Sequence, residues 1–323
     1  MVLSVGTFNL NNLFSRFNYQ AEVSELPKKD AVISSSTTFP VADPTAHRFR
    51  TYRGRLVLGK RAEERETIAD RIARIDADVL AVQEVEDIDT LKRFNTQDLG
   101  GRYRWVALIE GNDPRLIDLG LLSKLPLGAV TSWRHVIHRS LPSEPVFSRD
   151  LLQVEVLNQT RSRVLMTIFN NHLKSHYVPF DQDPVIGAQE ANATRQRQAE
   201  TAASIIDRQT RKRSAYVVVG DMNDPPDSAF LAPLVQNPAI SLVDALTTPQ
   251  ETQPAKSDNP PPPSTAWTHR FNESGKPARY ELFDHIWLSP ALAQKQTAAF
   301  IDRPTRHSGD GSDHDPAWVI LDL

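Results

Sequence analysis

The chain has 323 residues, of which 40% are hydrophobic and 24% charged, and this is the composition of an ordinary globular protein. It contains no cysteine, which excludes disulfides, thiolate zinc sites and cysteine nucleophiles. Its formal net charge of −3 argues against a dedicated nucleic-acid scaffold, but it leaves room for an enzyme that meets nucleic acid in a local basic groove.

The first part of the sequence predicts a strand, an irregular segment and a helix. Residues 2–8 are predicted to form a strand that no basic and apolar leader precedes, so we expect an intracellular protein or one whose leader was removed. Residues 15–62 show no periodicity, whereas isoleucine recurs at helical spacing within a predicted helix at 63–76. The irregular segment carries basic residues that form either a solvated loop or a contact for a polyanion. They are Arg48, Arg50, Arg53, Arg55, Lys60 and Arg61.

Strands and helices are then mixed along the chain. Further strands are predicted at 79–84, 103–109, 119–123, 151–157, 163–170, 216–219, 282–288 and 315–321. Helices are predicted at 88–96, 188–212 and 227–236, and a proline-rich loop at 249–264. We therefore expect one α+β domain over residues 1–323, a layered sandwich with sheets inside and helices outside, with an insertion at about 15–62. No stretch has the apolar length of a membrane span, so we expect no membrane insertion.

Polar clusters stand at the ends of several predicted strands, where core packing does not explain them. They are Asn9 and Asn11 after the first strand, Gln83-Glu84, Asn171-His172, Gly220-Asp221-Met222-Asn223 and Ser312-Asp313-His314. A strand end delivers such side chains to the edge of a sheet, so we expect the chemistry of this protein to lie at that edge.

The carboxylates and amides of these clusters each have a functional and a structural interpretation. Glu84 either anchors a hard cation such as Mg²⁺ or simply leaves the core. Asn9 and Asn11 either orient a metal-bound group and a phosphate or form a turn. Asp221 and Asn223 lie two residues apart after a buried strand, so Asp221 can take a proton from water while the amide of Asn223 holds a substrate oxygen. The alternative interpretation is that these residues form a turn.

Histidines supply the remaining candidates. A protonated histidine binds phosphate and stabilises developing charge, which fits His172 and His314, with Asp284 as an acid partner for the imidazole. The other histidines are assigned to structure or left undecided. His47, His135, His138, His269 and His307 are assigned to structure, and His176 and His285 stay undecided.

The whole set of groups points to a reaction class. Oxygen and amide ligands dominate, and no cluster has zinc spacing, so the ligand set favours Mg²⁺ or Mn²⁺. The chain has neither a Gly-rich phosphate loop nor a Gly-x-Ser-x-Gly element. Metal-assisted attack of water on phosphorus fits these observations best.

In their order along the chain, the motifs resemble those of the endonuclease/exonuclease/phosphatase superfamily, which is also called DNase I-like. The matching elements are Thr7-Phe8-Asn9-Leu10-Asn11, Gln83-Glu84-Val85, Asn171-His172-Leu173-Lys174-Ser175, Gly220-Asp221-Met222-Asn223, Phe283-Asp284-His285-Ile286 and Ser312-Asp313-His314. Each is short, but the ordered set is highly specific and covers nearly the whole chain. The resemblance implies a four-layered α/β/β/α sandwich with its site at one sheet edge.

The resemblance also implies which residues hold the metal and the substrate. Glu84 would be the main metal ligand, with Asn11 near it. Asp313 would hold a second metal or orient a metal-bound water. Asn9 and Asn223 would position active-site groups and the phosphate. Some members of the superfamily carry an acidic residue where this chain has Asn11.

The same resemblance implies the catalytic roles. Asp221 would activate the attacking water. His314, paired with Asp284, would stabilise the transition state. His172 would contact the phosphate or assist the leaving group. General acid–base help of this kind contributes roughly 10²–10⁴-fold to a rate.

Local segments narrow the choice of substrate. The residues before Asp284 differ from those typical of inositol polyphosphate 5-phosphatases and of AP endonucleases, and DNase I uses disulfides that this chain cannot form. The stretch 111–119 resembles a bacterial nuclease-like branch and places Arg115 and Asp118 near the substrate groove, although Asp118 is equally interpreted as a structural turn carboxylate. The element beginning at His172 also resembles that of sphingomyelinases.

We therefore predict a Mg²⁺- or Mn²⁺-dependent phosphodiesterase, specifically an endonuclease, with nucleic acid as its substrate and no stable protein partner. A lipid or small-molecule phosphoesterase on the same site is the first alternative. A catalytically inactive binding scaffold is a second alternative, of another class. It predicts the loss of Glu84, Asp221, Asp313 or His314, and all four are present.

Overall fold

Two mixed β-sheets form the centre of the protein in a computed structural model, which describes residues 1–14, 59–179, 181–252, 262–271, 275–303 and 311–323. In spatial order, the seven-stranded sheet consists of β12 (Gln250–Glu251), β16 (Gln296–Ile301), β17 (Ala317–Asp322), β1 (Val2–Leu13), β2 (Val79–Val85), β4 (Asp118–Ser123) and β3 (Trp105–Ile109). The six-stranded sheet consists of β11 (Val243–Asp244), β15 (Asp284–Leu288), β10 (Tyr216–Asp221), β9 (Val164–His172), β8 (Leu151–Leu157) and β5 (Leu127–Ser132).

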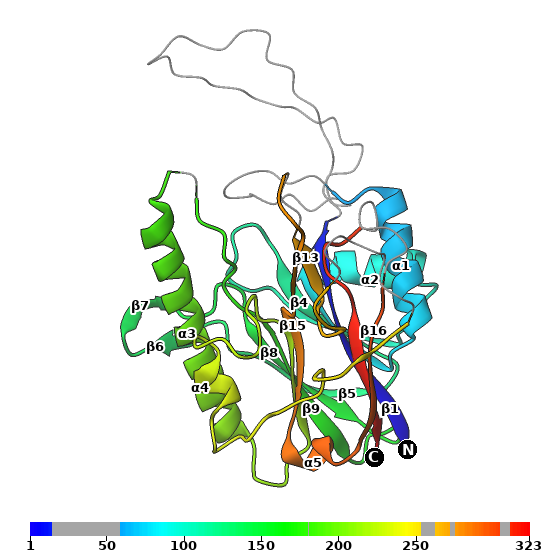
Figure 1. Cartoon of the computed structure of the whole chain (residues 1–323). Coiled ribbons are helices and arrows are strands. Elements are labelled where there is room, and N and C mark those ends of the chain that lie inside the picture. Colours follow the sequence, from blue (N-terminus) through cyan, green and yellow to red (C-terminus); the bar gives the residue numbers. More distant parts are fainter. Residues whose placement is uncertain (15–58, 180, 253–261, 272–274, 304–310) are drawn as a thin grey trace, which may run out of the picture.

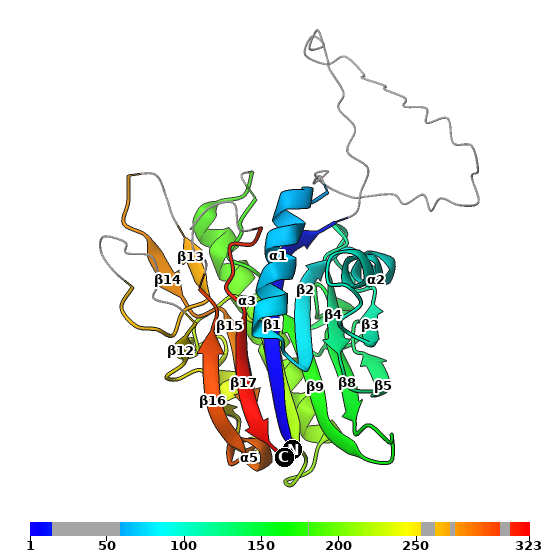
Figure 2. The same ribbon diagram turned by 90° about the vertical axis from the view of Figure 1, so that its right-hand side faces the viewer.

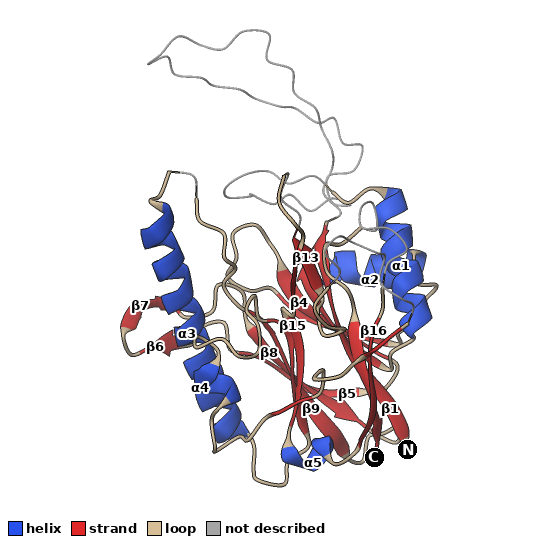
Figure 3. Ribbon diagram, in the orientation of Figure 1, coloured by secondary structure: helices blue, strands red, loops and turns tan. Residues whose placement is uncertain are grey.

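Helices cover the outer face of each sheet (Figures 1 and 2). On the seven-stranded sheet lie α1 (Ala62–Ile75) and α2 (Ile88–Gln97), and on the six-stranded sheet lie α3 (Pro184–Gln209) and α4 (Ala232–Val235). The short helix α5 (Pro290–Ala293) follows β15. Figure 3 shows the four layers by colour, and they confirm the predicted α/β/β/α sandwich. No helix in the described parts of the chain has both the length and the apolar character needed to cross a membrane.

Strand alternation explains how the layers hold together. In β2, Val79 and Ala81 join the cluster between the two sheets, whereas Leu80 and Val82 join the cluster beneath α1 and α2. Successive side chains of a strand point to opposite faces, so a continuous apolar run fills two interlayer cores at once. The strand β10 does the same between the sheet–sheet core and the core under α3.

Two small hairpins complete the fold. One consists of β6 (Ile137–His138) and β7 (Leu141–Pro145), and the other of β13 (His269–Phe271) and β14 (Arg279–Glu281). Neither hairpin was predicted, and neither were β5 and β16. All of these strands are partly exposed, so they lack the apolar runs that identify the central strands.

The helix predicted at 227–236 is wrong in length, because only Ala232–Val235 is helical. Pro233 lies in its first turn, where the missing N–H does no harm. A helix that began at residue 227 would place this proline in its interior, where the ring breaks the hydrogen-bond ladder. The predicted irregular segment 15–62 falls outside the described residues up to residue 58, and α1 begins at Ala62.

Candidate active site

Strand direction brings the predicted polar clusters to one edge of the sandwich. The strand β1 runs parallel to β2, and β9 runs parallel to β10, so their carboxyl ends reach the same edge. Their antiparallel neighbours β17 and β15 begin there. This edge lies opposite the end that holds both termini (Figure 1). A cavity of ≈ 720 Å³ opens at it, and the predicted residues that line it are Asn11, Glu84, Arg115, His172, Asp221, Asn223, Asp313 and His314.

The buried carboxylate of Asp221 lies at the centre of the site. Its Oδ2 accepts a hydrogen bond from Nδ2 of Asn9 at 2.9 Å, and its Oδ1 accepts one from the backbone N–H of Asn223 at 2.9 Å. Nε2 of His172 lies 3.4 Å from the same Oδ2, and Nε2 of His314 lies 3.8 Å from it. Burial, reinforced by the charge of Asp284, raises the pKa of Asp221 to about 6.

The imidazole of His314 is paired with a carboxylate from the other sheet. Its Nδ1 lies 2.6 Å from Oδ2 of the fully buried Asp284, the first residue of β15. Burial lowers the pKa of His314, but the carboxylates of Asp284 and Asp221 outweigh it and raise the pKa well above the ordinary value. Ser312 fixes the segment, because its hydroxyl donates to the carbonyl of Asn9 at 2.7 Å and accepts from the N–H of His314 at 3.1 Å.

Glu84 and Asn11 lie where the paired strands bulge. The β1–β2 register shifts between Asn9 and Leu13, and Glu84 and Asn11 have φ values of 61° and 45°. This left-handed conformation costs a non-glycine residue roughly 1–2 kcal/mol and is often found at functional sites. The N–H of Asn12 donates to Oε2 of Glu84 at 3.0 Å. Burial, together with the charge of Asp313, raises the pKa of Glu84.

The surroundings of His172 disfavour the protonated imidazole that the sequence led us to expect there. Burial lowers its pKa well below the ordinary value, and the charges of Arg149 and His314 act in the same direction. Its Nε2 lies 3.9 Å from Oε1 of Glu84 as well as near Asp221. The ring therefore stands between the two carboxylates at the bottom of the cavity.

Arginines line one wall of the cavity. Asp113 accepts two hydrogen bonds from Arg115, at 3.0 and 2.9 Å, and lies 3.3 Å from Nε of the buried Arg149. One carboxylate thus contacts two guanidinium groups. Asp118 is buried, accepts a hydrogen bond from the N–H of Gly111 at 2.8 Å, and is not among the residues that line the cavity.

The structure adds two histidines to the cavity that the sequence did not assign to it. His269 comes from the β13–β14 hairpin and His176 from the segment before α3, and both rings stack on Phe283, with centroids at 5.1 and 5.8 Å. Nε2 of His176 lies 3.0 Å from Asp224, which α3 holds through Arg195 at 3.0 Å. His269 had been assigned to structure because it is an isolated histidine in the sequence.

The other histidines lie away from this cavity or outside the described residues. His285 is buried, stacks on Trp287 and lies 2.8 Å from the carbonyl of Asp224. His135 lies before the β6–β7 hairpin and His138 lies in it. His47 and His307 are outside the described residues. Of the predicted basic cluster, only Lys60 and Arg61 are described: Lys60 donates to the carbonyl of Gly311, and Arg61 pairs with Glu64 at the start of α1.

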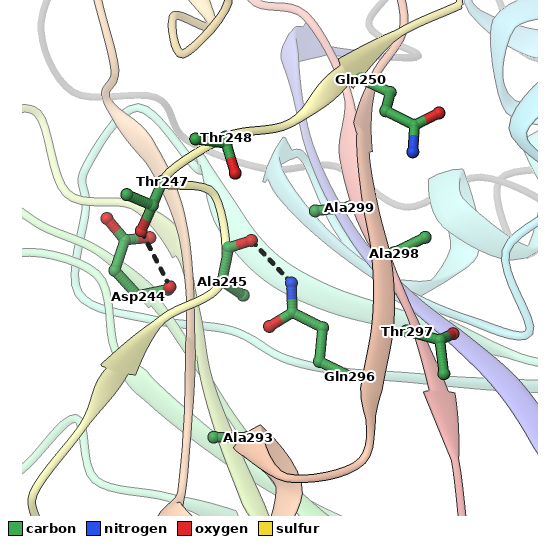
Figure 4. A pocket seen from close by; sticks show the side chains of 10 residues that line it. All are labelled: Asp244, Ala245, Thr247, Thr248, Gln250, Ala293, Gln296, Thr297, Ala298 and Ala299. Atoms are coloured by element: carbon green, nitrogen blue, oxygen red, sulfur yellow. Dashed lines mark hydrogen bonds between the residues drawn. The ribbon is translucent and has the colours of Figure 1, made fainter.

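Among the described residues, two groups of side chains have the geometry to hold a cation: one consists of His269, Asp313 and His314, and the other of Asp221, Asp284 and His314. Another hollow of ≈ 350 Å³ lies between the β11–β12 segment and β16 (Figure 4). Of the residues that the structure describes, Asp244 is the single carboxylate that lines it and no histidine does. Its Gln296 donates to the carbonyl of Ala245 at 2.9 Å. The ionisable groups therefore gather at the larger cavity.

Comparisons with known proteins agree with this architecture. The profile of the "Endonuclease/Exonuclease/phosphatase family" matches residues 6–314. No curated protein sequence matches the chain. A Bacteroides vulgatus endonuclease/exonuclease/phosphatase is similar in structure, with a TM-score of 0.60, 14% identity, and coverage of 100% of this chain and 99% of that one.

Two further structures resemble the chain at a similar level. An AP endonuclease from Archaeoglobus fulgidus has a TM-score of 0.56 and 13% identity, with coverage of 99% of this chain and 100% of that one. A mannosyl-6-phosphatase from Bacteroides thetaiotaomicron has a TM-score of 0.54 and 14% identity, with the same coverage. At this identity the likeness concerns the fold alone.

Proposed function

The chain belongs to the endonuclease/exonuclease/phosphatase family, and on this premise we propose that it is a divalent-metal-dependent phosphodiesterase, specifically a nuclease that cleaves its substrate by attack of water. The observation that carries the proposal is the position of Asp221. A buried carboxylate with raised pKa is oriented on both oxygens, by Asn9 at 2.9 Å and by Asn223 at 2.9 Å, and two imidazoles face it. Such a group is placed to accept a proton from water.

The donor set of the cavity fits a hard cation. Glu84 and Asp313 are carboxylates near enough for the charge of Asp313 to raise the pKa of Glu84, so a cation between them relieves their repulsion. We propose that Glu84 holds Mg²⁺ or Mn²⁺ with Asn11 nearby, and that Asp313 holds a second cation or orients a metal-bound water. When bound, the cation would polarise the phosphoryl oxygen and stabilise the charge of the transition state.

The protein side chains supply the remaining catalytic groups. Asp221 takes the proton of the attacking water, and Asn9 and Asn223 keep its carboxylate in place. His314, held in its charged form beside Asp284, stabilises the negative charge on the phosphoryl oxygens in the transition state. The neutral ring of His172 contacts the phosphate or assists the leaving group.

Nucleic acid is the proposed substrate because arginines line part of the cavity. Arg115, Arg149 and Arg279 line the cavity, and cationic side chains of this kind neutralise backbone phosphates. Arg115 and Asp118 were expected near the substrate groove. We propose a substrate contact for Arg115, and a supporting role for Asp118 through Gly111 and the loop that carries Arg115. The likeness to an AP endonuclease supports this choice of substrate.

A small-molecule or lipid phosphoesterase is the second candidate, and one observation favours it. The cavity of ≈ 720 Å³ lies within the range of roughly 300–1,000 Å³ that is usual for small-molecule sites. The likeness to a mannosyl-6-phosphatase points the same way. An inactive scaffold is disfavoured, because the carboxylates and imidazoles converge on one cavity and are held there by hydrogen bonds.

A substrate panel tests the proposal. Plasmid DNA, single-stranded RNA, sphingomyelin and a generic phosphodiester are incubated with the protein and Mg²⁺, and the His314→Ala protein serves as the blank. We expect the unmodified protein to cleave a nucleic acid that the His314→Ala protein leaves intact. Turnover of sphingomyelin or of the small diester alone would select the second candidate. No turnover of any of them, with a folded protein, would contradict the proposal.

A further inference from the structure

We propose that His269, Asp313 and His314 form a capture site for a transition-metal ion such as Zn²⁺, and that occupation of this site stops the reaction. The capture of the ion depends on the three side chains alone. The inhibition rests on the proposed function, because it requires His314 to act on the substrate. The two parts are therefore separated by experiment below.

The three side chains offer ligand atoms at nearly the spacing that a tetrahedral ion requires. Nε2 of His269 lies 3.7 Å from Oδ2 of Asp313, and Nε2 of His314 lies 3.9 Å from Oδ1 of the same carboxylate. All three ligand positions lie within 4.8 Å of one another. Zinc bonds of 2.0–2.1 Å place neighbouring ligands about 3.3 Å apart, so side-chain shifts of about 0.5 to 1.5 Å close the site.

Neighbouring groups hold both imidazoles in place. The backbones of His269 and His314 form an antiparallel β-bridge, and their ring centroids lie 4.9 Å apart. The ring of His269 stacks on Phe283, and His314 is hydrogen-bonded through Nδ1 to Asp284 at 2.6 Å. A ligating histidine usually gives its other ring N–H to a carboxylate, so His314 already has the orientation of a metal ligand.

The site is open to an ion that enters from solvent. The side chain of Asp313 is 54% exposed, and that of His269 is 15% exposed. Both line the cavity together with His314. No backbone movement is therefore needed before an ion reaches the carboxylate.

The ligand set selects transition metals over the proposed cofactor. Two imidazoles and one carboxylate are ligands typical of zinc sites, whereas Mg²⁺ prefers oxygen ligands and keeps several waters. Affinity should therefore rise from Mn²⁺ through Co²⁺ and Ni²⁺ to Cu²⁺, with Zn²⁺ below Cu²⁺. Binding would displace the proton on Nε2 of His314 to solvent, because a metal ligand must be deprotonated. The metal would then occupy the ring nitrogen that Asp284 leaves for the substrate.

Zinc inhibition tests the proposal in the active enzyme. Turnover of the best panel substrate is measured with saturating Mg²⁺ and increasing Zn²⁺, each protein being compared with its own zinc-free rate. His269→Gln should raise the half-inhibiting zinc concentration at least tenfold, because it removes a direct ligand. Even the loss of a residue that only hydrogen-bonds to a metal ligand lowers the affinity for the metal by roughly 10–100-fold. His176→Gln is the matched control, because His176 stacks on the same Phe283 and lies outside the site.

Direct binding supplies a readout that does not need activity. Calorimetric titration of Zn²⁺ in excess Mg²⁺, and the visible spectrum of Co²⁺, should reveal one site in the unmodified protein and in His176→Gln. His269→Gln and Asp313→Asn should weaken it at least tenfold. If His269→Gln and Asp313→Asn bind zinc as tightly as the unmodified protein, the proposal is overturned. It is also overturned if excess Mg²⁺ removes the zinc inhibition equally in the unmodified protein and in His269→Gln. A protein that binds zinc in this way but cleaves no substrate would instead contradict the proposed function.

Discussion

Nδ1 of His314 lies 2.6 Å from Oδ2 of Asp284. Asp284 begins β15 in the six-stranded sheet, and His314 lies just before β17 of the seven-stranded sheet. The pair therefore joins the two halves of the sandwich at the floor of the site. The relative position of the sheets decides whether this imidazole is held in its charged form.

Replacing Asp284 by Asn should lower kcat by roughly 10²-fold or more, because His314 loses the carboxylate that keeps it charged and oriented. Steady-state kinetics on the best panel substrate measures the loss, and circular dichroism checks the fold. Asp244→Asn is the control, since Asp244 lines the other hollow (Figure 4). A kcat within twofold of the unmodified enzyme would remove Asp284 from the mechanism.

Replacing Asp221 by Asn should abolish hydrolysis and leave the fold intact. The amide keeps the size of the carboxylate but accepts no proton from water, so turnover should fall by roughly 10²–10⁴-fold. Single-turnover measurements at saturating substrate separate this loss from weaker binding. Full activity of the variant would refute the proposed role of Asp221 in activating water.

Removal of divalent cations with EDTA should stop turnover, and Mg²⁺ or Mn²⁺ should restore it. Because a cation that binds only the folded protein stabilises it, added Mg²⁺ should also raise the melting temperature. Glu84→Gln should weaken both effects, since this carboxylate faces the cavity with raised pKa. If chelation changes neither rate nor melting temperature, a metal has no part in the mechanism.

Replacing Arg115 by Ala should raise KM for a nucleic-acid substrate more than it lowers kcat. The side chain is 46% exposed and its guanidinium, held by Asp113, lines the cavity. Loss of one phosphate contact should reduce the slope of log affinity against log salt by about 1. Arg161→Ala is the control, because Arg161 lies in the β8–β9 turn at the far end of the sandwich. An unchanged salt slope would exclude a phosphate contact for Arg115.

Replacing Asp150 by Asn should stabilise the protein at neutral pH but not at pH 3. Burial raises the pKa of Asp150 to about 6 from 3.8, so the folded protein loses stability as pH rises between these values and the loss is complete above about 6. Asn removes the charge and still accepts the hydrogen bond from the N–H of Trp133. The gain at pH 7 is at most about 3 kcal/mol, since each pKa unit corresponds to about 1.4 kcal/mol. Urea unfolding at pH 3 and pH 7 measures it, with the exposed Asp227→Asn as the reference.

Buried strands with polar ends were the part of the site that the sequence revealed. The apolar run Val217, Val218 and Val219 indicated a central strand, and Asp221 directly follows this run and Gly220 at the sheet edge. The order of the motifs then indicated the family and the four-layered fold, both of which are confirmed. These features are local, because a strand buried on both faces must be apolar along its length and only its end can carry charge.

The contacts between the clusters were decided by tertiary structure. Asn9 and Asp221 are 212 residues apart in the sequence, and only the face-to-face packing of the two sheets brings them to 2.9 Å. His269 illustrates the limit most clearly: nothing around it predicts a strand, yet the β13–β14 hairpin places it beside His314. The residue type fixes which chemical group a side chain carries. Its pKa and its hydrogen-bond partners depend on residues that are distant in the sequence and that only the tertiary fold brings near.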